Sequence, residues 1–507
     1  MPLRFYNTLS RSLEEFVPSG EGVGVYACGP TVYRPPHIGN FRTFVFNDIL
    51  HRYLEWKGFA VRFVMNLTDV EDKIIADAAQ RGVTIDEVTA PQVDAFRTDL
   101  DRLGIRPVDS YPRATEHIPQ MVALIERLIA NGHAYQRDGS IYFAIGSFPA
   151  YGRLSRIELV DTRSGAGLAA RAIDTDEYEK EDARDFALWK GAKDADRAAG
   201  AAWPTPWGDG RPGWHIECSA MSMAELGETF DIHTGGEDLV FPHHEDEIAQ
   251  SEGATGRPFV RYWLHVKHLL VNGEKMSKSK KNDFTIGQLI GMGHGAAAIR
   301  YILIGAQYRK ELNFSFAGLE DARNALQRLL DFDRRLDETV PVARGPSAGT
   351  PAGGRTAAAP GHRTAGAGAG ETADALTTIA ARALRRFEDA LDDDLNTPAA
   401  LAALFDFVRE SNAALDRAGR FVAVDEVEAA RAAFDRMDDV FGIVALAKRD
   451  AGNVEEGFAR WVEDRIAART DARGRRDFAA ADRIRDELAA AGVTVEDTPT
   501  GVRWKRR

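Results

Sequence analysis

The order of apolar and polar residues in the first part of the chain predicts an α/β fold. Val23–Ala27 is a short apolar run typical of a buried strand, and a turn rich in glycine and proline follows it. The next apolar residues recur at helical spacings of three and four: Phe41, Val45, Ile49, Tyr53 and Trp56. Phe59–Asp69 then returns as a strand. This order indicates parallel strands, whose ligands bind at the strands' carboxyl ends, beside helix N-termini.

The middle of the chain predicts an insertion into this sheet. Residues from about 110 to 205 contain a helical pattern over Thr115–Ala130 and a hairpin pattern over His133–Ile145. The sheet pattern resumes near Gly213–Met223 and again near Phe230–Phe241. We therefore expect Cys218 to lie on a strand.

From residue 316 onward the pattern is helical. One helix is predicted to begin with Thr397 as its N-cap and Pro398 in the first helical position. Arg344–Gly370 has no large apolar residue to bury, which predicts a disordered surface loop. After residue 446, two helical runs precede a small hairpin with a cationic end.

Composition and charge narrow the class of protein. With 507 residues, 44% of them apolar and 28% charged, the chain has enough apolar surface for several domains. The N-terminus lacks a secretory pattern and no run of about 18 apolar residues occurs, so we expect a cytoplasmic protein with no membrane partner. A formal charge of −13 argues against a non-specific polyanion binder, but a local basic patch can still bind nucleic acid.

The two cysteines, Cys28 and Cys218, lie far apart in the sequence. They exclude a disulfide framework and a zinc ribbon with paired cysteines. A lone cysteine is most often a small buried apolar residue, so either one alone predicts nothing.

The stretch VFPHHEDEIAQ, Val240–Gln250, holds two histidines and three carboxylates in five consecutive positions. With Pro242 as the first helical residue, His243 and Glu247 lie four apart on one helix face. Such a pair is more often simply solvated. If the strands predicted to carry Cys28 and Cys218 are neighbours, however, two thiolates, an imidazole and a carboxylate meet, and that set suits zinc.

A second group of residues suits a nucleotide. His37 and Gly39 lie in PHIGN, at a predicted helix N-terminus where small backbone and a ring donor can approach a phosphate. Lys275 and Lys278 lie in KMSKS, where ammonium groups can stabilise the charge on a leaving pyrophosphate. The two motifs, in this order and about 240 residues apart, point to ATP.

Together these segments resemble the cysteinyl-tRNA synthetase family of class I aminoacyl-tRNA synthetases. The segments that carry the resemblance are CGPTVY (Cys28–Tyr33), PHIGN, NLTDVEDKI (Asn66–Ile74), GRPGWHIECSAM (Gly210–Met221), FDIHTGGEDLVFPHHEDEIAQ (Phe230–Gln250), KMSKSKKN (Lys275–Asn282) and DDDLNTPAAL near residue 395. DRIRDEL and EDTPTGVRW extend it to the C-terminal end.

The resemblance implies a domain organisation. A Rossmann-like parallel-sheet core is expected over residues 1–110 and 206–265, interrupted by an inserted connective subdomain at 111–205. A KMSKS-bearing connecting region at 266–315 and a helical bundle at 316–445, with its insertion at 344–370, are expected next. Residues 446–507 are expected to form a small α+β anticodon-binding domain.

The resemblance also implies site residues. The expected zinc ligands, for one Zn²⁺ per subunit, are Cys28, Cys218, His243 and Glu247. The expected cysteine-binding residues are Gly29, Thr68, Trp214, His233 and Asp238. ATP, entering with Mg²⁺, is expected at His37, Gly39, Asn40, Lys275 and Lys278. The family activity implied is activation of L-cysteine and its transfer to tRNA(Cys), by a chain we expect to be monomeric.

One residue departs from the family pattern, and two other functions stay open. Asn40 stands where the family motif usually has a second histidine; an amide can donate to a phosphate but carries no charge.

A related ligase that joins activated cysteine to an amino sugar shares the core motifs but does not need the C-terminal segment. A non-catalytic zinc and RNA-binding protein would have no use for KMSKS.

Overall fold

The computed structural model describes residues 1–157, 184–276, 282–342, 375–419, 422–475, 477–490, 493–498 and 501–506. The predicted loop at 344–370 and Lys278 of KMSKS lie outside these ranges. The chain divides into two compact units, Met1–Ile443 and Val444–Arg507. No described helix is both long and apolar enough to cross a membrane.

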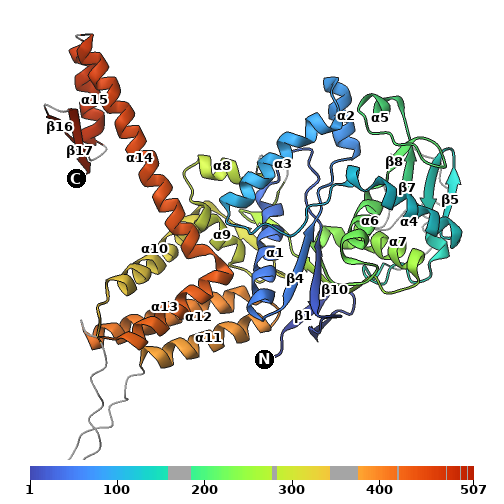
Figure 1. Cartoon of the computed structure of the whole chain (residues 1–507), viewed down its shortest axis with the longest axis horizontal. Helices are drawn as coiled ribbons and strands as arrows, with labels where there is room; N and C mark the ends of the chain where they lie inside the picture. Colours follow the sequence, from blue (N-terminus) through green and yellow to red (C-terminus); the bar gives the residue numbers. More distant parts are fainter. Residues whose placement is uncertain are drawn as a thin grey trace, which may run out of the picture. The chain divides into compact units, whose positions relative to one another are not determined.

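A four-stranded parallel sheet forms the centre of the first unit (Figure 1). Its strands are β3 (Gly22–Ala27), β4 (Ala60–Met65), β9 (Phe230–Gly236) and β10 (Val260–Val266), in the order β10-β9-β3-β4. All three pairings are parallel, and Tyr26 lies level with His233. The predicted α/β class is confirmed. Because β3 leads outward to β4 and β9 leads outward to β10, the strand order reverses between β3 and β9, where open α/β sheets bind ligands.

Helices cover both faces of this sheet. α1 (Ile38–Trp56) joins β3 to β4 and lies on one side, while α6 (Trp214–Leu226) and α7 (Glu245–Thr255) lie on the other (Figure 1). α2 (Asp72–Arg81) and α3 (Ile85–Arg102) follow β4. The buried side of α1 carries the apolar residues that its spacing predicted, apart from the partly exposed Trp56.

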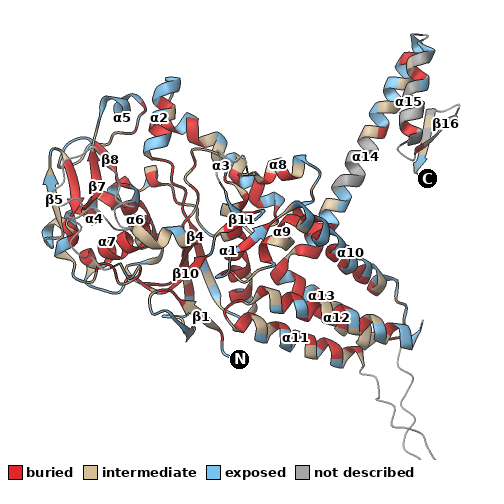
Figure 2. Cartoon of the chain, turned by 180° about the vertical axis from the view of Figure 1, so that it is seen from behind, coloured by how far each residue is buried: buried red, intermediate tan, exposed pale blue. Residues whose placement is uncertain are grey.

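The prediction that a strand carries Cys218 is wrong, because Cys218 lies in the middle of helix α6. His215 to Ser222 are all buried, so this part of the helix has no solvent-exposed face. A short run buried on every side looks the same in sequence whether it is a helix or a central strand. Figure 2 shows this buried layer continuing through α7.

The insertion is built on an antiparallel sheet, as the hairpin pattern predicted. It contains α4 (Ile118–Ala130), β5 (Ala134–Arg137), β6 (Ser140–Phe143), β7 (Phe186–Gly191), α5 (Asp194–Ala198) and β8 (Gly210–Pro212). The strand order is β5-β6-β7-β8. Because β8 pairs with β7, this sheet continues past the predicted boundary at residue 205. One apolar core joins the insertion to the parallel sheet.

The rest of the first unit is a short connecting region and a helical bundle. The remaining strands are β1 (Arg4–Asn7), β2 (Ser12–Glu15), β11 (Leu269–Val271), β12 (Glu274–Lys275), β13 (Leu312–Phe314), β14 (Pro341–Val342) and β15 (Val422–Ala423). The remaining helices are α8 (Ile286–Gly291), α9 (Ala296–Ile304), α10 (Phe316–Glu338), α11 (Leu376–Asp392), α12 (Thr397–Ala418) and α13 (Val424–Phe441). Asn396, not Thr397, caps α12, because its side chain accepts from the Ala399 N–H at 3.3 Å.

The second unit has its own small core. The long helix α14 (Ile443–Gly474) leads into this unit, followed by α15 (Phe478–Ala490) and a hairpin of β16 (Val493–Thr498) and β17 (Gly501–Arg506). Val462, Leu488 and Val493 are buried together there. The predicted hairpin is confirmed, whereas the first predicted helical run belongs to a longer helix.

Candidate active site and metal centre

The point where the strand order reverses carries the first group of functional side chains. Cys28 directly follows β3, and its N–H donates to the carbonyl of Thr234 on β9 at 3.1 Å. His233 lies on β9, Cys218 on α6, and Glu247 in the first turn of α7. Four separate segments, one of them about 190 residues from the others, therefore converge at the carboxyl end of the sheet.

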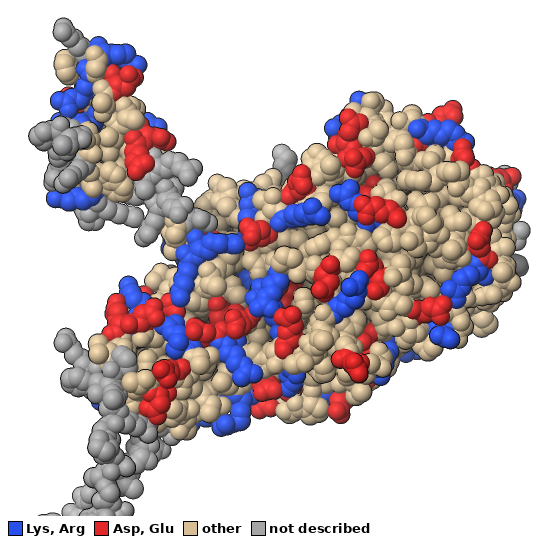
Figure 3. All heavy atoms as spheres, in the orientation of Figure 1, with Lys and Arg blue, Asp and Glu red and all other residues tan. Residues whose placement is uncertain are grey.

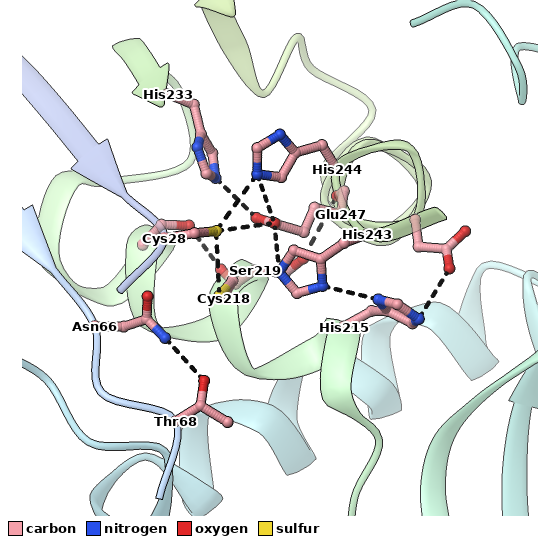
Figure 4. A network of polar contacts seen from close by, with 12 residues as sticks. Cys28, Asn66, Thr68, His215, Cys218, Ser219, His233, His243, His244 and Glu247 are labelled. Atoms are coloured by element: carbon pink, nitrogen blue, oxygen red, sulfur yellow. Dashed lines mark hydrogen bonds and ion pairs between the residues drawn. The ribbon is translucent and has the colours of Figure 1, made fainter. Parts of the chain in front are cut away.

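Side chains of the four predicted zinc ligands point toward one another (Figure 4). The donor atoms of Cys28, Cys218, His243 and Glu247 all lie within 4.8 Å of one another. The two sulfur atoms are 3.9 Å apart, and Nε2 of His243 lies 3.1 Å from Oε1 of Glu247. Ligands about 2.0–2.3 Å from one tetrahedral zinc ion lie about 3.3–3.8 Å apart, so the donor set fits such an ion.

A second set of side chains overlaps the first. Cys28 and Glu247 also group with His233 and His244 within 4.8 Å. Nε2 of His244 lies 3.4 Å from Sγ of Cys28, and Nε2 of His233 lies 3.0 Å from Oε2 of Glu247. His244, for which no ligand role was expected, is fully buried against the other members of this set.

Further buried groups hold these imidazoles in place. Nδ1 of His243 lies 2.9 Å from Nδ1 of His215, whose Nε2 lies 3.3 Å from Asp246. Nδ1 of His244 lies 2.8 Å from Nε2 of His265. Partners of this kind fix ring orientation and tautomer.

Burial sets the protonation of the cluster. It lowers the pKa of His243 to about 3, so the ring is neutral and able to coordinate above that pH. Burial also raises the pKa of the Cys28 thiol well above its usual range, and Cys218 and Glu247 nearby raise it further. A bound cation would favour the thiolate and so oppose that shift.

The segment before α7 agrees with the prediction in part. Within Val240–His244 the residue with non-helical backbone angles is Phe241 (φ −143°, ψ 134°), so the backbone is helical from Pro242 onward, as predicted. α7 itself begins only at Glu245, so His243 lies just before it. His243 still faces Glu247, with Nε2 3.1 Å from Oε1.

A cleft of about 390 Å³ opens beside the cluster. Its lining includes eight of the predicted site residues: Cys28, Gly29, His37, Gly39, Asn40, Trp214, Asp238 and Lys275. Thr68 and His233 are buried and lie outside this lining. A cleft of this volume suits a small-molecule substrate.

His37 and Asn40 form a reciprocal cap at the start of α1. Nδ1 of His37 accepts from the Asn40 N–H at 3.4 Å, and Oδ1 of Asn40 accepts from the His37 N–H at 3.1 Å. With Nδ1 accepting, the neutral ring carries its proton on Nε2, which can donate to a ligand. Burial, and then the charge of Arg34, lower the pKa of His37.

The two nucleotide motifs meet at Gly39. A Cβ atom there would clash with the methyl of Met276, the residue after Lys275, and would crowd the His37 ring. The Ile38 N–H also donates to the Phe284 carbonyl at 2.8 Å. Glycine therefore lets the PHIGN turn pack directly against the KMSKS segment.

The predicted cysteine-binding residues approach the cluster from several sides. The Gly29 N–H donates to Asn66, whose amide donates to Oγ1 of Thr68 at 3.1 Å. Trp214 is 39% exposed and stacks on His243, with ring centroids 4.4 Å apart. Asp238 is exposed in the turn after β9.

Comparison with known proteins identifies the family. Residues 15–324 match the tRNA synthetases class I (C) catalytic domain, and 386–445 match the DALR domain. Residues 457–504 match the cysteinyl-tRNA ligase anticodon binding domain. A cysteine–tRNA ligase from Solibacter usitatus is 46% identical over 512 residues, covering 100% of both chains. The chain belongs to the cysteine–tRNA ligase family.

Other members of this family match over similar lengths. The cysteine–tRNA ligase of Symbiobacterium thermophilum is 44% identical, covering 100% of both chains. That of Protochlamydia amoebophila is 42% identical over 100% of this chain and 98% of the relative. Among solved structures, Mycobacterium tuberculosis methionyl-tRNA synthetase with methionyl-adenylate has a TM-score of 0.56 at 17% identity, covering 85% of this chain and 92% of that one. That likeness concerns the fold.

Sequence reasoning missed the histidines around the cluster of this family member. His215, His244 and His265 each contact another imidazole of the group. His215 and His244 directly follow the predicted site residues Trp214 and His243 in the sequence. That adjacency could have indicated that they lie near the site. His265 lies on β10, and nothing in its local sequence marks it.

Proposed function

We propose that the chain activates L-cysteine with ATP and transfers it to the 3′-terminal adenosine of tRNA(Cys). The observation that carries this is the convergence of two cysteines, a histidine and a glutamate beside a cleft that PHIGN and Lys275 also line. The match of residues 457–504 to an anticodon binding domain supports tRNA over the amino-sugar alternative. The intact KMSKS motif argues against a non-catalytic protein that only binds zinc and RNA.

Cys28, Cys218, His243 and Glu247 are the zinc ligands in this proposal. We prefer them to the set with His233 and His244 because they include both sulfur donors, and His233 and His244 then act by orienting Glu247 and Cys28. A zinc ion held there would supply a Lewis acid that a substrate thiolate binds far better than a serine hydroxyl does. Magnesium would enter with ATP.

The chain's own residues then position the reactants. Trp214, Thr68, Gly29 and His233 would enclose the cysteine side, and Asp238 would accept from its ammonium group. His37, through Nε2–H, and Asn40, through its amide nitrogen, would donate to the phosphates, and Lys275 and Lys278 would supply positive charge to them. The cysteine carboxylate attacks the α-phosphate and releases pyrophosphate, and the tRNA hydroxyl then displaces AMP. No protein nucleophile is needed, so positioning and charge supply the acceleration.

ATP–pyrophosphate exchange with cysteine and with serine tests this function. We expect kcat/KM for cysteine to exceed that for serine by at least about 10⁴, because metal–sulfur coordination separates substrates that a pocket of the same shape could not. Transfer RNA(Cys) should accept cysteine from the same preparation. Equal exchange with both amino acids would contradict selection by the metal centre, and cysteine transfer to an amino sugar without tRNA charging would favour the alternative ligase.

Zinc affinity is expected to rise with pH. His243 is already neutral above about pH 3, so it contributes no proton between pH 6 and 8. The Cys28 thiol, with its raised pKa, and the Cys218 thiol are protonated there and must each lose a proton on binding. Two protons predict a gain of about a hundredfold in affinity per pH unit, measured by competition with a chelator corrected for its own protonation. An affinity independent of pH would contradict ligation by both thiols.

A further inference from the structure

Arg34 lies in the turn that leads into α1, at the edge of the cleft. Pro35 and Pro36 follow it. Proline fixes its own φ angle and confines the preceding residue to extended conformations, so this turn has little freedom. The backbone therefore holds Arg34 beside His37 and Asn40, which line the same cleft.

A weak ion pair restrains the side chain of Arg34. Its Nη1 lies 3.4 Å from Oδ2 of Asp283, and both side chains are partly exposed. The guanidinium carbon lies 5.3 Å from the centre of the Tyr33 ring. One long contact to a carboxylate engages few of the five N–H donors of an arginine, in contrast to a close bidentate pair.

Asp283 is itself fixed relative to the start of α1. Its neighbour Phe284 accepts a hydrogen bond from the Ile38 N–H at 2.8 Å, and His37 forms an isolated bridge with Thr285. The carboxylate that holds Arg34 is therefore set by backbone contacts rather than by the ion pair alone. Removing Asp283's charge should free Arg34 without moving the segment.

The described part of the cleft has few cations for a triphosphate. The lowered pKa of His37 leaves its ring neutral at pH 7, and Asn40 is uncharged. Lys267 is paired with Glu237 at 2.6 Å, and His268 lies 3.6 Å from the same carboxylate. Among the described lysines and arginines of this lining, Lys267 has a close ion pair, whereas Arg34 has only the 3.4 Å contact with Asp283 and Lys275 is exposed.

We propose that Arg34 binds the ATP triphosphate, and that Asp283 holds the guanidinium at the cleft edge until ATP arrives. The inference rests on the proposed function. It assigns to Arg34 the positive charge that Asn40 cannot supply on the α1 side of the cleft. Phosphate is the ligand for which an arginine's fork of donors is best suited.

Cysteine-dependent ATP–pyrophosphate exchange by the full-length zinc-loaded protein tests the proposal. Arg34→Gln is expected to lower kcat/KM for ATP by about 30- to 100-fold, the usual effect of losing a charged hydrogen bond. The KM for cysteine should stay within about threefold. Arg34→Lys should recover part of the loss. Transfer of cysteine from preformed cysteinyl-adenylate to tRNA should be unchanged, because that step involves no triphosphate.

Asp283→Asn separates phosphate binding from a purely structural tie. We expect the fall in kcat/KM for ATP to be at least tenfold smaller in Asp283→Asn than in Arg34→Gln. The double variant should have the same kcat/KM for ATP as Arg34→Gln. Equal losses in both single variants, with no further loss in the double, would overturn the proposal in favour of a structural ion pair. Unchanged exchange in Arg34→Gln would overturn it outright.

Two measurements keep this result distinct from other failures. Arg62→Gln removes another arginine–carboxylate pair, with Glu225, whose members do not line the cleft, and it should exchange as the unaltered protein does. Thermal unfolding of all variants checks that folding is intact. If the unaltered protein shows no cysteine-dependent exchange, the proposed function is wrong. If the unaltered protein and Arg34→Gln exchange equally well, the proposed role of Arg34 is wrong and the proposed function stands.

Discussion

Cys218→Ser is expected to lose zinc and to lower kcat/KM for cysteine in the exchange reaction by about a thousandfold or more, equivalent to about 4 kcal/mol. Cys218 is buried on α6 with its sulfur 3.9 Å from that of Cys28. A hydroxyl is a poor zinc ligand, so the variant leaves three donors. Preference for cysteine over serine should fall with the metal, while the KM for ATP stays within about threefold. Zinc content by mass spectrometry and exchange kinetics give both readouts.

Two further variants make this result specific. Ser222→Ala changes another buried polar residue on α6, one turn from Cys218, and should keep both zinc and selectivity. His244→Asn tests the overlapping set of donors: if His244 only orients Cys28, zinc is retained with affinity lowered about 10- to 100-fold. Full zinc in Cys218→Ser with none in His244→Asn would instead assign the metal to Cys28, His233, His244 and Glu247.

The sequence predicted the residues of the candidate site better than their local structure. Residue type and motif brought Cys28, Cys218, His243 and Glu247 together, and the structure places their donor atoms in one cluster. The secondary structure predicted for the segments that carry these residues was partly wrong. Cys218 comes from a helix rather than a neighbouring strand, and α7 itself begins at Glu245, after His243.

The secondary structure of these segments and the long-range contacts of the site could not be predicted from the sequence, for physical reasons. The middle of α6, His215–Ser222, and the first two turns of α7 are buried on all sides, so they lack the solvent-exposed face by which helical periodicity is read. The contact between His244 and His265 joins α7 to β10, and nothing local specifies such a long-range pair. By contrast, α1 and the C-terminal hairpin each have a local pattern strong enough to be predicted. Charge was a weaker guide, since the face seen in Figure 3 intersperses acidic and basic side chains.

Removing residues 447–507 is expected to abolish tRNA charging while cysteine-dependent exchange stays within about threefold. The cut falls between the match to the DALR domain, which ends at 445, and the match to the anticodon binding domain, which begins at 457. The removed residues carry their own buried core, formed by Val462, Leu488 and Val493. The first unit contains every described residue of the candidate site. Loss of a whole contact region for RNA should lower kcat/KM for charging by about a hundredfold or more.

A point variant within the second unit separates loss of tRNA contact from damage at the cut. Val462 is fully buried, so Val462→Asp places an unpaired charge in the small core and should unfold this unit. We expect it to reproduce the truncation, with exchange retained and charging lost. Glu463→Ala, at the exposed neighbouring position, should charge tRNA as the unaltered protein does. If truncation left charging intact, recognition of tRNA(Cys) would have to reside in the first unit. If exchange were lost together with charging, the second unit would be needed for catalysis itself.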